Sequence, residues 1–120
     1  MKKSIMAYCQ DKQGAVKEYP FGPEPEVYKV GGKMFAFIYE GEEDTFRINL
    51  KCDPVIAGNL REQLESVKPG YHMNKKHWNT VIVDGSLSLS EIHDMIDHSY
   101  SLVVSKLPRS QRDLLQEQQE

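Results

Sequence analysis

Three short segments rich in β-branched and aromatic residues, joined by tight turns, constrain the fold of this chain most strongly. They are Glu26–Val30, Lys33–Tyr39 and Thr45–Cys52. Gly31-Gly32 separates the first two and is typical of a two-residue hairpin turn, because glycine adopts the positive φ angles that such turns require. The acidic segment Glu40–Asp44 separates the second from the third. We therefore expect three consecutive strands that pair mainly antiparallel.

The third of these segments alternates strictly between apolar and polar residues. Its residues of even number are Phe46, Ile48, Leu50 and Cys52. Its residues of odd number are Thr45, Arg47, Asn49 and Lys51. Because successive side chains of a strand point to opposite faces of the sheet, this pattern predicts one buried face and one solvated, basic face.

A helix is predicted after the third strand. Asp53 and Pro54 are typical of the N-cap and the first position of a helix. We expect this helix to continue until Lys68-Pro69-Gly70 ends it. Its apolar residues Ile56, Leu60 and Leu64 lie on one stripe.

The last long helix is marked at both ends. Ser88 and Glu91 form a capping box at its start, and Pro108 ends it. Apolar residues recur between them at helical spacing, which predicts a stripe that packs on the core. The stripe consists of Leu89, Ile92, Ile96, Tyr100, Val103 and Leu107. Ser99 and Tyr100 are candidates for tying this helix to the sheet.

The remaining segments complete an α+β pattern. A short amphipathic helix is predicted over Lys2–Gln13, and a fourth strand over Trp78–Val83. Between the first helix and the strands lies a proline-rich loop, whose Tyr19 and Phe21 we expect to anchor it to the core. The order predicts a two-layer α+β sandwich with a mainly antiparallel sheet and helices on one face. We expect one domain over residues 1–108 and a polar tail, an appendage, over residues 109–120.

Composition limits the classes of function. The chain has 120 residues, a formal net charge of −3 and a pI of about 5.8, so it does not bind nucleic acid through bulk positive charge. It contains no apolar run long enough for a membrane helix and no signal-peptide pattern, so we expect a cytoplasmic monomer. Its two cysteines, Cys9 and Cys52, are isolated, which favours reduced, packed thiols.

The segment Pro69–Asp84 carries the strongest functional signal. It contains two histidines, two adjacent lysines and the single tryptophan, with no acid before Asp84. Lysines reach phosphates, and polar side chains beside them donate to phosphates or base edges. DNA binding by this segment would therefore use Lys75 and Lys76 first, supported by His72, Asn74 and His77.

The same residues also have structural interpretations. The lysine pair could simply solvate a turn. For Trp78 we favour a core or rim aromatic that opens a strand over a residue that stacks on bases. The polar residues of the third strand, which are Arg47, Asn49 and Lys51, could extend the DNA site, or form an ordinary solvated sheet face. Because the acids of Glu40–Asp44 would repel phosphates, DNA would approach from the Lys75 side.

Metal binding and catalysis have little support in the sequence. His93 and His98 are five residues apart, so on a helix they point about 140° apart and do not share an ion. The chain has no phosphate-binding glycine loop, no nucleophile elbow and no HExxH motif. Asp97-His98-Ser99 is contiguous on a helix, so its side chains diverge. We expect no metal, no cofactor and no enzymatic activity.

Several motifs, in order along the chain, resemble the MmcQ/YjbR family of small bacterial proteins. The longest is Pro69-Gly-Tyr-His-Met-Asn-Lys-Lys-His-Trp-Asn-Thr-Val. The shorter ones are Tyr19-Pro-Phe-Gly-Pro, Val30-Gly-Gly-Lys-Met-Phe-Ala, Leu50-Lys-Cys-Asp-Pro, Asp84-Gly-Ser-Leu, Asp97-His-Ser-Tyr and Lys106-Leu-Pro. The resemblance covers nearly all of the chain from Tyr19 to Pro108.

The resemblance implies a CyaY-like, or frataxin-like, α+β fold. It also implies DNA binding through a double-wing arrangement of the sheet and loops, and it brings no catalytic residues. We therefore expect weak DNA binding without sequence specificity. The alternative is a protein-interaction module that uses the same exposed strand and the Tyr71–Trp78 segment to bind an acidic peptide.

Overall fold

The computed structural model describes residues 1–41, 45–71 and 73–118, which form six strands and four helices. The helices are α1 (Lys2–Gln10), α2 (Pro54–Gln63), α3 (Leu89–Ser105) and α4 (Arg109–Gln118). The strands are β1 (Val16–Glu18), β2 (Glu26–Val30), β3 (Lys33–Glu40), β4 (Phe46–Lys51), β5 (Val67–Pro69) and β6 (Trp78–Val83). Within these ranges no helix is both long and apolar enough to span a bilayer.

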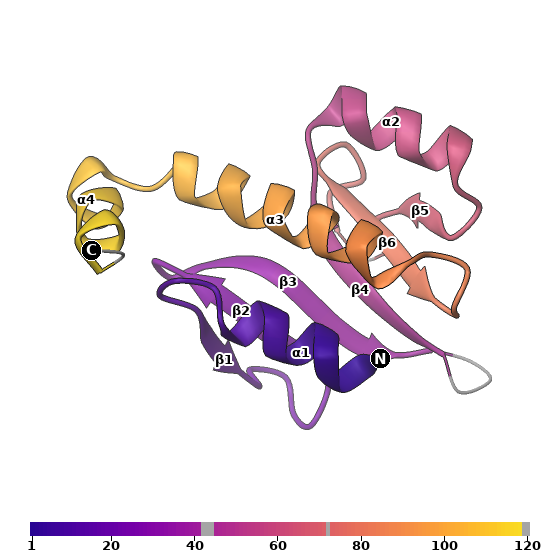
Figure 1. The fold of residues 1–120 in the computed structure, drawn as a ribbon, viewed down its shortest axis with the longest axis horizontal. Coiled ribbons are helices and arrows are strands. Elements are labelled where there is room, and N and C mark those ends of the chain that lie inside the picture. Colours follow the sequence, from indigo (N-terminus) through magenta and orange to yellow (C-terminus); the bar gives the residue numbers. More distant parts are fainter. Residues whose placement is uncertain (42–44, 72, 119–120) are drawn as a thin grey trace.

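The molecule has two layers, one of helices and one formed by a single six-stranded sheet. Its strand order is β1-β2-β3-β4-β6-β5, and every neighbouring pair is antiparallel. Figure 1 shows α1 and α3 lying across one face of this sheet, with α2 beside α3 over its β6 and β5 side. The predicted α+β architecture is confirmed.

The core lies between α3 and the strands β3 and β4. Helix α3 buries Ile92, Ile96 and Val103 from the predicted stripe, and the even-numbered residues of β4 meet them. The capping box is also formed, since Ser88 Oγ accepts from the Glu91 N–H at 3.1 Å. The stripe and cap predicted from sequence therefore place this helix correctly.

A single buried hydroxyl joins α3 to the sheet at a β-bulge. The pairing of β2 with β3 shifts register so that Phe35 has no partner residue. Ser99, which is fully buried, donates its hydroxyl to the Phe35 carbonyl at 2.5 Å and accepts from the Lys51 N–H at 2.9 Å. The expected tie between α3 and the sheet is confirmed at Ser99. Tyr100 instead donates to the Gln13 carbonyl after α1.

Helix α1 is held against α3 by a small polar cluster. Tyr8 donates to Asp97 Oδ1 at 2.6 Å, and the Lys12 ammonium donates to the same oxygen. Partial burial alone would raise the pKa of Asp97, but the hydrogen bonds from Lys12 and Tyr8 outweigh it and hold that pKa below its ordinary value. The carboxylate is therefore stabilised in its charged form in the folded protein.

The structure contains two strands that were not predicted from the sequence. β1 and β5 have three residues each, which is too short to show an alternating pattern. The predicted continuation of α2 to residue 68 is wrong, because Leu64 has an extended backbone and the chain then enters β5. The first helix also ends earlier than predicted, at Gln10.

The polar C-terminal segment forms helix α4 and packs back on the body of the protein. Leu115 belongs to the partly buried residues around the core. Its neighbour is Gly14, where an added Cβ would lie 2.6 Å from Leu115 Cδ2 and where φ is +76°. Glycine at this position therefore both allows the left-handed backbone and leaves room for α4.

Replacing Ser99 with alanine should lower the free energy of unfolding by about 1–3 kcal/mol, because a buried carbonyl and a buried N–H both lose their partner. Urea denaturation at pH 7 measures this. Ser101→Ala is the matched control, since Ser101 is exposed on the same helix and gains the same helix propensity. Equal stabilities of the two variants would contradict the role given to Ser99.

The Asp97 cluster should make stability depend on pH on the acid side. A carboxyl whose pKa is lowered by folding contributes stability above its unfolded pKa of about 3.9 and loses it as pH falls through the folded pKa. Asp97→Asn should therefore flatten the fall in stability below about pH 5. Because Asp97 is partly exposed, the loss at pH 7 should stay below about 1 kcal/mol. Asp113→Asn, on exposed α4, should leave the acid profile unchanged.

Candidate nucleic-acid interface

The face of the sheet opposite the helices, here called the open face, carries two hollows separated by Tyr71. The first, of 450 Å³, is bordered by Phe21, Phe37 and Tyr39. The second, of 590 Å³, is bordered by Tyr39, Arg47 and Lys68. The register places Arg47 opposite Tyr39 and Lys68 opposite Thr80, so these side chains share the open face. Tyr71 borders both hollows.

A buried hydrogen-bond network fixes Tyr71 between the hollows. The Asn49 amide oxygen accepts from Tyr39 at 3.2 Å and from Thr80 at 2.6 Å, while its Nδ2 donates to the Tyr71 carbonyl at 3.2 Å. Thr80 Oγ1 in turn accepts from the Tyr71 N–H at 2.9 Å. Burial raises the pKa of the Tyr39 phenol, so that group remains a hydrogen-bond donor at neutral pH. Hydrogen bonds to both its N–H and its carbonyl thus hold the backbone of Tyr71 in place.

This network corrects one prediction. Asn49 was expected on a solvated strand face with Arg47 and Lys51, but only 2% of it is exposed. The segment after β5 folds over the open face and covers it. Asn49 therefore positions Tyr71 and does not reach a ligand.

Arg61 of α2 fixes the other end of the segment that joins β5 to β6. Its Nε donates to Asn79 Oδ1 at 2.7 Å, and its Nη2 donates to the carbonyls of Trp78, at 3.0 Å, and Lys75. No sequence pattern pointed to this residue, because an arginine on a helix is ordinarily solvated. Its three acceptors become visible only in the folded chain.

The predicted site residues of this segment have different roles. Lys75 and Lys76 are exposed, as DNA binding requires. Asn74 Oδ1 accepts from the Lys76 N–H at 3.0 Å, and the His77 carbonyl accepts from the Cys52 N–H at 2.8 Å, so both residues shape the turn. His72 lies outside the described residues. Trp78 opens β6 and is buried, in agreement with its structural interpretation.

The structure separates the two cations predicted on β4. Arg47 borders the second hollow, beside Lys68, which was not predicted. Lys51 instead lines a cavity between α2 and α3, on the helix side. Among the described residues, the cations that border the second hollow are therefore Arg47 and Lys68, while Lys75 and Lys76 are exposed further along the segment that joins β5 to β6.

Exposed aromatic rings accompany these cations. Tyr71 is 59% and Phe21 is 70% exposed, and the Phe21 ring lies 6.3 Å from Phe37 of β3. The expectation that Tyr19 and Phe21 anchor their loop to the core is therefore wrong, since both are exposed and Phe21 packs on the open face. Exposed rings next to cations can stack on bases while the cations contact phosphates.

Two acids limit how an anion can approach. Glu24 borders the first hollow and Glu40 the second. Glu40 is paired with Lys2, and its N–H donates to the Glu24 carboxylate at 2.7 Å. A polyanion would therefore be repelled at this end and would approach over Lys68 and the 75–76 pair.

The metal-ligating residue types and the two cysteines are the candidates for a second site. Residues 1–41, 45–71 and 73–118 contain no group of three His, Cys, Asp or Glu side chains that could hold a metal. Cys9 and Cys52 are buried free thiols, as expected. Burial raises the pKa of Cys9 to about 12, so this thiol stays protonated and unreactive at neutral pH.

Known proteins share both the sequence and the fold. The YjbR family model matches residues 10–102. The Escherichia coli K12 protein YjbR is 38% identical over 111 residues, which cover 92% of this chain and 93% of YjbR. YbdF of Escherichia coli O157:H7 is 44% identical over 91 residues, covering 76% of this chain and 74% of YbdF.

Two solved structures have the same fold as this chain. The crystal structure of Deinococcus radiodurans protein DR2400, described as a DUF419 domain, superposes with a TM-score of 0.86 at 32% identity, covering 96% of this chain and 87% of that one. A Pseudomonas syringae crystal structure gives a TM-score of 0.74 at 29% identity, covering 86% of this chain and 98% of that one. The family motifs, the matched residues and the shared fold lead to one conclusion: the chain belongs to the YjbR family.

Proposed function

We propose that this protein binds DNA weakly and without sequence specificity through the open face, with unpaired strands preferred over duplex. The observation that carries the proposal is the placement of Tyr71. It is an exposed ring with a fixed backbone, it lies between two hollows, and the hollow on one side is bordered by Arg47 and Lys68. This combination of a stacking surface and nearby cations suits a single strand.

The preference for unpaired bases follows from the exposed rings. A duplex hides the faces of its bases inside the stack, so Tyr71 and Phe21 would gain nothing from it. A single strand offers a base face at every nucleotide, and stacking on an aromatic side chain contributes about 1–3 kcal/mol per base.

The strength of binding follows from the number of cations. Four positive side chains are candidates for phosphate contacts: Arg47 and Lys68, which border the hollow beside Tyr71, and the exposed pair Lys75 and Lys76, which follow Tyr71 in the same connecting segment. If each neutralises one phosphate of a single strand, log K should fall with log salt with a slope of about −3. With a net charge of −3 on the whole chain, binding should be weak at physiological salt and clear only at low salt.

Reversing the lysine pair should test the electrostatic part. Lys75→Glu/Lys76→Glu should weaken binding to labelled oligothymidylate by about tenfold or more at low salt and flatten the salt slope, as measured by fluorescence anisotropy. Lys3→Glu/Lys106→Glu is the matched control, because both lysines are exposed elsewhere and the change in net charge is the same. Equal losses in the two double variants would contradict a local site.

Removing the Tyr71 ring should test stacking. Tyr71→Ala should weaken oligothymidylate binding by about fivefold to a hundredfold, while Tyr71→Phe should retain it, because stacking needs the ring and not the hydroxyl. Both variants keep the backbone bonds to Asn49 and Thr80. Retention of binding by Tyr71→Ala would remove stacking from the mechanism.

The same assay separates DNA binding from recognition of an acidic protein. Poly-glutamate of matched charge offers carboxylates but no bases. DNA binding predicts that this peptide competes poorly with oligothymidylate. Competition at equal charge concentration would instead support the alternative, an interaction module for acidic peptides.

A further inference from the structure

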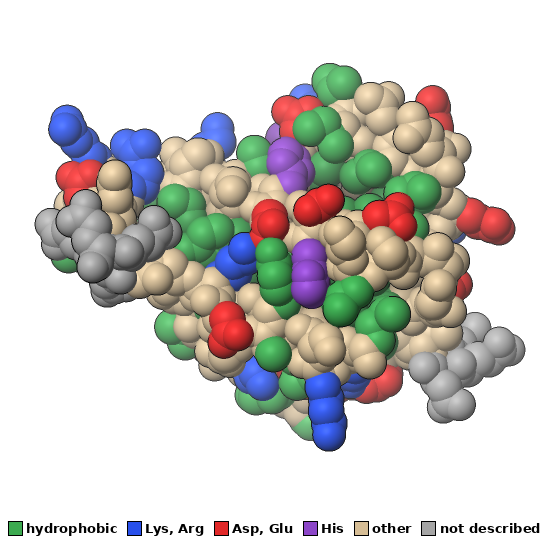
Figure 2. Space-filling model, in the orientation of Figure 1, with side chains coloured by type: hydrophobic (Ala, Val, Ile, Leu, Met, Phe, Trp, Pro, Cys, Tyr) green, Lys and Arg blue, Asp and Glu red, His purple; other side chains and the backbone are tan. Residues whose placement is uncertain are grey.

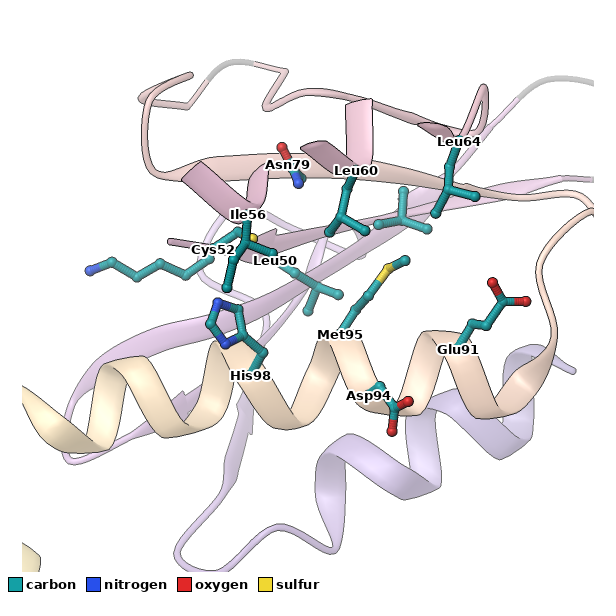
Figure 3. A pocket seen from close by; sticks show the side chains of 12 residues that line it. Leu50, Cys52, Ile56, Leu60, Leu64, Asn79, Glu91, Asp94, Met95 and His98 are labelled. Carbon is teal, nitrogen blue, oxygen red and sulfur yellow. The ribbon is translucent and has the colours of Figure 1, made fainter. Parts of the chain in front are cut away.

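A cavity of 350 Å³ lies on the helix side of the sheet, between α2 and α3. Figure 2 shows hydrophobic side chains reaching the surface between these two helices. Inside the cavity, Leu60 and Leu64 project from α2 and Met95 projects from α3 (Figure 3), while Leu50 and Val81 form the floor. A volume of this size with a mainly apolar lining is typical of sites for small molecules.

The cavity exists because α2 does not close on α3. Helix α2 packs mainly against β5, and Ala57 is its buried residue. The stripe of Ile56, Leu60 and Leu64, which was predicted from its spacing, therefore lines the cavity, and Ile56 is 44% exposed. Apolar surface that is left open to solvent in this way often marks a binding site.

One buried amide is aimed into this apolar cavity. Asn79 is only 2% exposed, and its Oδ1 accepts from Arg61 Nε at 2.7 Å. Because a guanidinium group can only donate, the amide oxygen must face Arg61 and the amide nitrogen must face the other way. Figure 3 shows that nitrogen turned toward the interior of the cavity. Within the described part of the chain, Asn79 Nδ2 has no hydrogen-bond partner.

This buried donor requires an acceptor that a ligand can supply. A buried N–H₂ group that lacks a partner is costly. A water molecule at this position would face apolar side chains, although buried waters usually make about three hydrogen bonds. A carbonyl oxygen needs no further partner, whereas a hydroxyl group would leave its own hydrogen unpaired among these side chains. The amide therefore favours a ligand with a carbonyl oxygen.

The charged residues that line the cavity leave its interior neutral. The Lys51 ammonium extends out of the cavity and away from Asn79, and the Asp94 carboxylate lies on the side of α3 that is turned away from α2 (Figure 3). Glu91 lines the cavity at the start of α3, where its Oε1 accepts from the Ser88 N–H at 3.0 Å. An ion in the interior would lose its hydration without gaining a partner of opposite charge.

His98 adds no charge at the other end of the cavity. Its Nε2 accepts from the Asp53 N–H at 3.1 Å, so this nitrogen carries no proton and the ring is neutral. The Asp53 carboxylate accepts from the N–H groups of Val55 and Ile56, so it is held at the start of α2. The lining as a whole therefore favours a neutral ligand.

We propose that this cavity binds a neutral aliphatic compound that carries one carbonyl group, such as a ketone or an ester. The carbonyl oxygen accepts from Asn79 Nδ2, and the hydrocarbon chain lies along Leu60 and Met95. Glu91 and His98 are seven residues apart on α3, so the cavity is about 10 Å long, which matches a chain of about eight carbons.

Titration with methyl hexyl ketone tests this site on the full chain. We expect saturable one-to-one binding by calorimetry, with a dissociation constant of about 1 mM or below. Methyl ethyl ketone, which has four fewer methylenes, should bind about a hundredfold more weakly. Octanoate and octylamine should each bind at least about tenfold more weakly, because their charges lose hydration. Absence of saturable binding up to about 5 mM ketone, or equal binding of either ion, would overturn the proposal.

A substitution at Asn79 tests the hydrogen bond. Asn79→Asp keeps an oxygen for Arg61 and replaces the donor by a second acceptor. The wild-type protein should bind methyl hexyl ketone more tightly than the alcohol with the same carbon chain, because only the alcohol has a hydrogen to pair. In Asn79→Asp this order should reverse, with the ketone at least about tenfold weaker than in wild type. The same order in both proteins would overturn the role of Asn79.

Two tryptophan variants locate the ligand in the cavity. Met95→Trp should fill the cavity and abolish ketone binding, while Ser101→Trp, at an exposed position of the same helix outside the cavity, should retain it. Amide NMR spectra confirm that each variant is folded. Retention of binding by Met95→Trp, or its loss in both tryptophan variants, would overturn the assignment.

This site is independent of the open face. Methyl hexyl ketone should perturb amide resonances around the cavity, such as those of Leu60 and Met95, and leave oligothymidylate binding unchanged. Perturbation only around Tyr71 would overturn the cavity as the site. Failure of DNA binding would leave the cavity proposal intact.

Discussion

Two hydrogen bonds of Ser99 hold α3 in place on the sheet, and the other helices are arranged around α3. The two bonds join α3 to the bulge of β3 and to the end of β4 at one buried hydroxyl. A helix fixed in this way can bury Ile92 and Ile96 against the centre of the sheet, and α1 then docks on it through Tyr8, Lys12 and Asp97. Because α3 is held over β3 and β4, the room above β6 is left to α2.

The two faces of the sheet consequently differ in character. The helix face combines a dense core with an apolar cavity that α2 leaves uncovered (Figure 3). The open face has no helix, and its order comes from the buried amide of Asn49, which holds Tyr71 in place. Arg61 and Asn49 fix the two ends of the same connecting segment, so the exposed lysines and the exposed ring are presented by a segment that is held by hydrogen bonds.

Sequence patterns predicted those parts of the fold that depend on local chemistry. The Gly31-Gly32 hairpin, the Asp53 cap and the Ser88 capping box are set by neighbouring residues, and the structure contains all three. The short strands β1 and β5 owe their existence to pairing partners distant in sequence, so three residues carry no signal of their own. Asn49 looked solvated because its alternation with apolar residues says nothing of a segment that folds over it. The spacing of Ile56, Leu60 and Leu64 predicted an apolar stripe, but periodicity does not reveal whether a second helix closes on that stripe.

We propose that the open face, with Tyr71 and its neighbouring cations, binds a single strand of DNA. NMR titration of the ¹⁵N-labelled full chain with oligothymidylate at low salt, followed through amide and side-chain resonances, tests this proposal. We expect shifts that saturate and cluster at Arg47, Lys68, Tyr71, Lys75 and Lys76, with none in α1. Saturating shifts confined to other surfaces, or no shifts at low salt, would contradict it.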